Sequence, residues 1–114
     1  LCCTFDGDIL DMLRSVYVMK AYDRFDLLNN ADRQGKKIVS ELKQIDGLYD
    51  VRGVGLLVAF DLSNKKSRDM FVDKLRNMGM ICNPTGEKSV RLRPNLAVTD
   101  QEVDLAIKMI RSVT

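Results

Sequence analysis

The sequence lacks histidine, has few cysteines and contains no long apolar run, and each absence excludes a class of function. Without histidine there is no His general base, no Ser-His or Cys-His nucleophile pair and no His-ligated metal site. The three cysteines, Cys2, Cys3 and Cys82, are odd in number and not at metal-ligand spacing. They favour a reduced, cytoplasmic setting (the mitochondrial matrix is the alternative) over a disulfide framework. No apolar run approaches the roughly 20 residues that span a bilayer, so we expect no membrane partner.

An excess of charge of one sign is also missing. Lys and Arg total 18 against 16 Asp and Glu, a net charge of +2, which gives little attraction to nucleic acid. The order of elements expected from residue 51 onward is similar to half of a ferredoxin-like RNA-binding module. Such modules stack bases on exposed sheet aromatics, but the strands expected here contain only Phe60. We expect no nucleic acid partner.

What is present is typical of one globular domain of 114 residues, 46% hydrophobic and 30% charged, with amphipathic helices. Helical spacing extends over residues 9–22, after Asp8 as a candidate N-cap, and over residues 26–45. We expect both apolar stripes to face a core. Gly35 should pack closely against a neighbour, because glycine otherwise costs a helix about 1 kcal/mol. The stripes are Ile9, Met12, Leu13, Val16 and Met19, and Leu28, Ala31, Gly35, Ile38, Leu42 and Ile45.

The middle of the chain changes from helix to strand patterns. The apolar run at residues 56–60 predicts one buried strand. A third helix follows and ends at Gly79. Residues 80–82 then predict a short strand, which Asn83 and Pro84 interrupt.

The end of the chain completes an α+β fold. Residues 89–93 alternate in polarity and predict a strand, and Thr99 with Glu102 forms a capping box before a last helix. The expected architecture is helices packed on a small, largely antiparallel sheet. We divide it into residues 1–45, a loop with linking helices, and residues 46–114, a small α+β domain. Because the chain opens at Leu1 in residues that look internal, we expect a piece of a longer protein.

Pattern alone places few residues for chemistry. The Gly53-Val54-Gly55 pair lacks the third glycine of a phosphate loop and precedes a strand, so it indicates a tight turn or a close backbone approach. The lysines lie on polar faces or in turns, where nothing lowers the pKa of an amine for Schiff-base chemistry. The paired carboxylates are typical of a solvated turn and of a helix first turn; they are Asp6 with Asp8 and Asp100 with Glu102.

Arg91 is the exception. It lies mid-strand between apolar residues and shares its face with Arg93. A guanidinium there can hold a carboxylate with two parallel hydrogen bonds. The alternative is a solvated strand face with a surface ion pair.

Four segments together resemble a known family. They are CTFDGD at 3–8 followed by LDMLR at 10–14, LLNNA at 27–31 with Gly35, VRGVGL at 51–56, and GEKSVRLRP at 86–94 with Leu96, Val98 and Thr99. In this order they resemble the C-terminal part of the class III (fold type I) pyridoxal-phosphate aminotransferases. The branch they resemble is that of L-lysine 6-aminotransferase and 4-aminobutyrate aminotransferase.

The resemblance implies transfer of an amino group to 2-oxoglutarate through pyridoxal phosphate, by a homodimer with shared active sites. Thr4 would bind the cofactor phosphate of the neighbouring subunit, and Arg91 would bind a substrate carboxylate. The family's cofactor-binding lysine lies upstream, in a large domain missing here, so we expect no catalytic residue in this chain and no activity from it alone.

Two residues depart from the family pattern. Asp6 and Asp8 stand where the loop Ser-Thr-Phe/Trp-Gly-Gly-Asn has its first glycine and its asparagine. Asp6 adds a Cβ and a negative charge near a phosphate. The alternative function is therefore a non-enzymatic ligand-binding or association domain derived from this scaffold.

Overall fold

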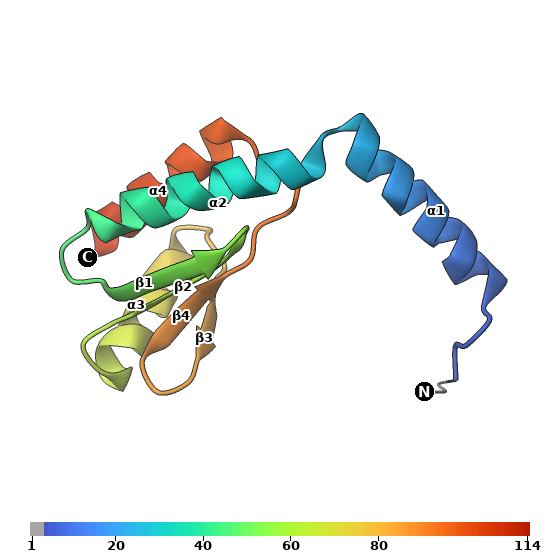
Figure 1. Cartoon of the computed structure of the whole chain (residues 1–114). Helices are drawn as coiled ribbons and strands as arrows, with labels where there is room; N and C mark the ends of the chain where they lie inside the picture. Colours follow the sequence, from blue (N-terminus) through green and yellow to red (C-terminus); the bar gives the residue numbers. More distant parts are fainter. Residues whose placement is uncertain (1–3) are drawn as a thin grey trace.

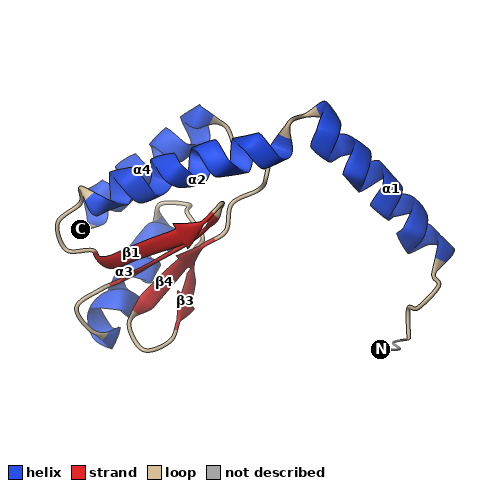
Figure 2. Cartoon of the chain, in the orientation of Figure 1, coloured by secondary structure: helices blue, strands red, loops and turns tan. Residues whose placement is uncertain are grey.

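The computed structural model describes residues 4–114, which fold into four helices and four strands (Figure 1, Figure 2). Cys2 and Cys3 lie outside the described residues. The elements are α1 (Ile9–Arg24), α2 (Leu27–Lys43), β1 (Tyr49–Val54), β2 (Leu57–Asp61), α3 (Lys65–Asn77), β3 (Asn83–Thr85), β4 (Ser89–Leu92) and α4 (Asp100–Val113). The α+β class expected from the sequence is confirmed.

The strands form one antiparallel sheet in the order β1-β2-β4-β3. The strand predicted at 56–60 is present as β2 (Leu57–Asp61), but the sequence analysis missed β1, which precedes it and pairs with it as a hairpin. Val54 pairs with Leu57 across a two-residue turn. Gly55 in that turn has a φ of 55°, a conformation open to glycine at no steric cost.

The third strand also differs from the prediction. Residues 80–82 are not a strand; the chain joins the sheet at Asn83–Thr85, and Pro84 pairs with Val90 of β4. β3 is an edge strand. A proline is tolerated there, because its lack of an N–H group does not remove a hydrogen bond from the sheet.

Helices α2, α3 and α4 pack on one face of the sheet, and α2 and α4 lie side by side (Figure 1). Alternate residues of the two central strands point into this layer. Phe60 of β2 meets Phe71 of α3 edge to face, with ring centroids 5.7 Å apart. The strand residues buried in the core are Val58, Phe60, Val90 and Leu92.

Helix α2 provides most of its predicted stripe to this core. Gly35, Ile38 and Leu42 are buried, whereas Leu28 is exposed. A Cβ added to Gly35 would overlap the carbonyl oxygen of Gly55 in the β1–β2 turn. The predicted close packing of Gly35 is confirmed.

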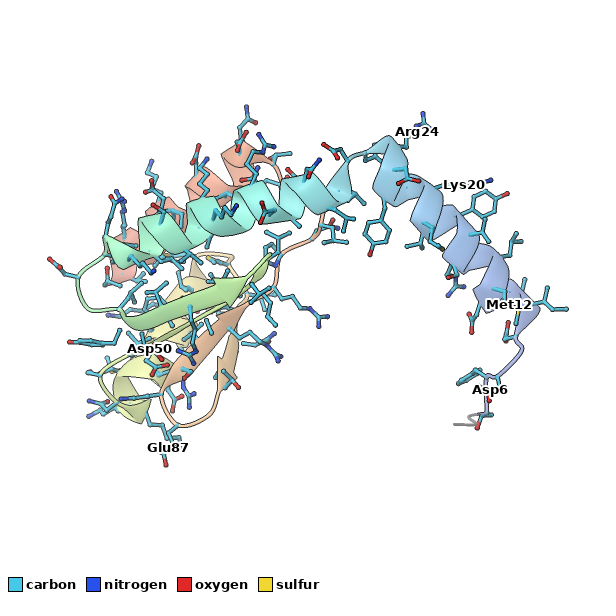
Figure 3. All side chains as sticks on the ribbon, viewed as in Figure 1. Asp6, Met12, Lys20, Arg24, Asp50 and Glu87 are labelled. Atoms are coloured by element: carbon cyan, nitrogen blue, oxygen red, sulfur yellow. The ribbon has the colours of Figure 1, made fainter. Side chains whose placement is uncertain are left out.

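Helix α1 projects away from the rest of the molecule (Figure 1). With α1 included, the molecule measures 47 × 31 × 25 Å. The Asp8 carboxylate accepts a hydrogen bond from the Asp11 amide at 3.0 Å, so the predicted N-cap is confirmed. The expectation that its stripe faces a core is wrong for residues 4–114, because α1 has no buried residue. Its side chains project from all sides of the helix (Figure 3); the exposed stripe is Ile9, Met12, Leu13, Val16 and Met19.

The capping box before α4 is confirmed. The Thr99 hydroxyl accepts a hydrogen bond from the Glu102 amide at 3.2 Å and donates one to the Glu102 carboxylate at 3.0 Å. Among residues 4–114, no helix has the length and apolarity needed to cross a membrane.

Candidate functional site

Strand alternation places a charged set of residues on the face of the sheet opposite the helices. On β2, Ala59 and Asp61 alternate with the buried residues, and on β4 Ser89 and Arg91 do so. Arg52 of β1 pairs with Ala59, Ala59 pairs with Arg91, and Asp61 pairs with Ser89. We call these five residues the open face.

A hydrogen-bonded network occupies one part of the open face. The Ser89 hydroxyl donates to Asp61 Oδ1 at 2.5 Å, and Arg52 Nη1 donates to the same oxygen at 3.2 Å. Arg52 also donates to the Asp50 carboxylate at 2.9 Å. The hydrogen bond from Ser89 and the charge of Arg52 lower the pKa of Asp61 below its usual value. Asp61 is therefore an ionised carboxylate whose Oδ1 already accepts from two donors.

Arg91 occupies the other part of the open face. Its side chain is exposed and, within residues 4–114, makes no hydrogen bond or ion pair. Its neighbours in the sheet are the small Ala59 on β2 and Asn83 on β3. A guanidinium in this state keeps its forked N–H groups available for a carboxylate. Arg93, one residue beyond β4, is likewise exposed and unpaired within the described part of the chain.

Arg68, which the sequence analysis missed, fixes the turn before β4. Its side chain is 6% exposed and donates from Nη1 to the backbone carbonyls of Thr85, Gly86 and Ser89 at 3.1–3.3 Å. Its Nε donates to Asp69 at 2.7 Å. A signal existed: Arg68 lies three, four and seven residues before the buried apolar residues of α3, on the same helical face.

Helix α2 fixes the segment after β4. The Asn30 amide donates to the carbonyls of Leu96 at 2.8 Å and Val98 at 3.1 Å. Four residues on, the buried Gln34 donates to the Asp100 carboxylate at 2.9 Å, and this bond lowers the pKa of Asp100. Strand β4 is thus tied to helices before and after Arg91.

Thr4 lies far from this site. It is exposed in the turn that precedes α1, near Asp6 at the end of the molecule opposite the sheet (Figure 3). The structure therefore does not bring Thr4 and Arg91 together within one chain. Asp8, which departs from the family pattern, caps α1, and asparagine is an equally favourable residue at such a position.

The lysines of residues 4–114 lie at the surface. Every lysine in residues 4–114 is exposed except the half-buried Lys37. The hydrogen bond that Lys37 donates to Asp104 at 2.8 Å raises its pKa, so its amine stays protonated, whereas a Schiff-base lysine must lose its proton. Nor do three or more Asp, Glu or Cys residues of residues 4–114 come together as a metal site.

Comparison with known proteins identifies the family. The Aminotransferase class-III family matches residues 1–114. L-lysine-epsilon aminotransferase of Mycobacterium tuberculosis is 32% identical over 96% of this chain and 25% of its own length. Acetylornithine aminotransferase of Archaeoglobus fulgidus is 33% identical over 94% of this chain and 27% of its own.

A solved structure agrees with the sequence relatives. Lysine aminotransferase from M. tuberculosis in the internal aldimine form superposes with a TM-score of 0.88 and 31% identity, over 99% of this chain and 27% of that one. The chain spans about a quarter of the length of the relatives that it matches. This chain, with its helices on a small antiparallel sheet, belongs to the class III aminotransferase family.

Proposed function

We propose that this chain is the C-terminal part of an enzyme that transfers an amino group to 2-oxoglutarate through pyridoxal phosphate. The amino donor is an amine-bearing amino acid of the lysine or 4-aminobutyrate type. The relatives named as lysine-epsilon and acetylornithine aminotransferases support the transferase class. The chain alone is inactive in this proposal, because its lysines are exposed or held protonated.

The proposal rests on the unpaired state of the Arg91 side chain. Its guanidinium is exposed and unpaired within residues 4–114, while Arg52 on the same face is bound to carboxylates. An unpaired arginine on a rigid strand suits a planar carboxylate with two parallel hydrogen bonds. Both substrates of an amino-acid aminotransferase carry such a group, so Arg91 would bind and orient a substrate carboxylate.

The rest of the active site lies elsewhere in this proposal. A large domain upstream would supply the lysine and the remaining cofactor contacts, and pyridoxal phosphate supplies the chemistry that labilises the substrate's amino group. Thr4, which lies in the turn before α1 and not on the sheet that carries Arg91, would donate to the cofactor phosphate of a partner subunit in a homodimer. The division of the chain at residue 45 and a cytoplasmic (or mitochondrial-matrix) setting belong to the same proposal.

Arginine variants of the full-length polypeptide test this function. We expect Arg91→Ala to lower kcat/KM for 2-oxoglutarate by roughly 30-fold to several-thousand-fold, the loss typical of truncating one partner of a desolvated charge pair. Arg91→Lys should lose less, because lysine keeps the charge without the fork. The cofactor's absorption spectrum should change little.

Arg93→Ala is the matched control, since Arg93 is also exposed and unpaired in the described residues. If Arg93→Ala abolishes the activity and Arg91→Ala leaves it within about twofold, Arg93 binds the substrate carboxylate in place of Arg91. If a full-length polypeptide has no amino-transfer activity and no cofactor, the non-enzymatic alternative replaces this proposal. The extra carboxylate of Asp6 beside Thr4 is the feature that would favour that alternative.

A further inference from the structure

The open face contains two arginines on opposite sides of β2 that both lie near one carboxylate, although the register of β1 shifts between Tyr49 and Arg52. Arg52 on β1 and Arg91 on β4 pair with Ala59 from its two sides. Each arginine is therefore diagonal to Asp61, two residues further along β2. Diagonal neighbours in antiparallel sheets lie about 7–8 Å apart, within reach of long side chains.

Only one of the two arginines binds Asp61. Arg52 donates to Asp61 at 3.2 Å, whereas Arg91 makes no ion pair within residues 4–114. The Ser89 hydroxyl occupies the same Asp61 oxygen at 2.5 Å. Asp61 is thus the carboxylate of the open face that could neutralise Arg91, and it is held by other donors.

We propose that Arg52 is a positioning residue that keeps Asp61 away from Arg91, so that Arg91 stays available for the substrate carboxylate. This inference rests on the proposed function of Arg91. Without Arg52, the Asp61 carboxylate has only the Ser89 hydroxyl as a hydrogen-bond donor. The cations left near it are Lys88, which already acts on its charge, and Arg91 at the diagonal position on β4. An intramolecular ion pair between Asp61 and Arg91 then competes with the substrate.

The test compares variants of the full-length polypeptide by the dissociation constant of 2-oxoglutarate, measured by calorimetry. Arg52→Ala should weaken binding about fivefold, the cost of displacing a partly exposed ion pair. Adding Asp61→Asn to Arg52→Ala should restore the affinity to within about twofold of the wild type, because the competing charge is gone. Arg52→Gln, which keeps most of the side-chain length, replaces Arg52→Ala if the alanine variant does not fold.

Each other outcome overturns the inference in a distinguishable way. If the loss in Arg52→Ala is not restored by Asp61→Asn, Arg52 acts only by supporting the strand. If Arg91→Ala weakens binding but Arg52→Ala does not, the inference fails and the proposed function stands. If neither single variant changes the dissociation constant, the proposed function fails with it. A crystal structure of the Arg52→Ala variant should show Asp61 paired with Arg91; an Asp61 that stays away from Arg91 contradicts the inference.

Discussion

Gly35 of α2 lies against Gly55 of the β1–β2 turn so closely that a Cβ on Gly35 would overlap the Gly55 carbonyl oxygen. The helix therefore rests directly on the backbone of the hairpin. Gly53 of β1 is less tightly packed: its added Cβ would lie 3.0 Å from the Leu57 carbonyl oxygen and 3.2 Å from a Val39 methyl group of α2. This contact sets the height of α2 above the sheet that carries Arg52 and Arg91.

Gly35→Ala should destabilise the protein, although alanine is the better helix former by about 1 kcal/mol. The added methyl group meets backbone, which cannot rotate away, so we expect a net loss of about 1–3 kcal/mol in the free energy of unfolding. Urea unfolding measures it. Ser40→Ala, at an exposed position of the same helix, should change stability by less than about 0.5 kcal/mol. Equal stability of Gly35→Ala and the wild type would contradict the close contact.

Arg68→Met should also destabilise the protein. Methionine fills much of the space but leaves the carbonyls of Thr85, Gly86 and Ser89 without their shared donor. Because these carbonyls belong to half-buried or exposed residues, we expect a loss of about 1–3 kcal/mol, measured as a fall in the urea midpoint. The control is Arg76→Met in the same helix, whose side chain is 62% exposed and pairs with Asp73 at 3.4 Å; it should lose less than about 1 kcal/mol. Similar losses in both variants would show that Arg68 does not hold the turn.

Stability should depend on pH through Asp61. Its folded pKa lies below the ordinary value of 3.8 because Ser89 and Arg52 favour the carboxylate. Its stabilisation is therefore fully present above pH 3.8 and is lost as the pH falls through the lower folded pKa. The stability difference between wild type and Asp61→Asn should shrink in acid, since the other carboxylates titrate in both proteins. Urea unfolding at a series of pH values measures this difference, and a constant difference would contradict the prediction.

The isolated 114-residue chain should self-associate through α1. An apolar surface larger than a few hundred Å² rarely stays free in a monomer, and α1 exposes large apolar side chains along its length. Leu13→Lys with Val16→Lys should shift the sedimentation coefficient toward the monomer. Leu105→Lys on α4, where a single leucine is 55% exposed, should not. A wild-type chain that sediments as a monomer in dilute solution would contradict the prediction.

The sequence predicted the helices well because their signals are local. The Asp8 cap and the capping box at Thr99 each depend on residues three positions apart, and the structure confirms them. The close approach at Gly35 is also confirmed, although its partner Gly55 could not be identified from the sequence. Helix α1 shows the limit of this reasoning. Its periodic stripe predicts a buried face, but no neighbour for that face lies in residues 4–114.

The strands were harder to predict because their pairing is not local. Pro84 indicates a break in any central strand, and only the order of the sheet shows that β3 is an edge where proline fits. The β1–β2 hairpin was missed although residues 49–52 alternate in polarity, because Gly53 and Gly55 were interpreted as a turn and only the apolar run after them as a strand. Without that hairpin, neither the link between Arg52 and Asp61 nor the contrast between Arg52 and Arg91 could be foreseen. The roles given to Thr4 and Arg91 stay predictions.

Strand β4 is bracketed by two side chains that bind backbone. Arg68 holds the turn before it and Asn30 holds the segment after it. The main chain around Arg91 is therefore already ordered, so no conformational entropy of about 1–2 kcal/mol per residue need be lost there when a partner is bound. Fixing the Arg91 guanidinium then costs only the rotamer entropy of one side chain, at most about 2 kcal/mol. In entropic terms, Arg68 and Asn30 leave more of the interaction energy of Arg91 available for affinity.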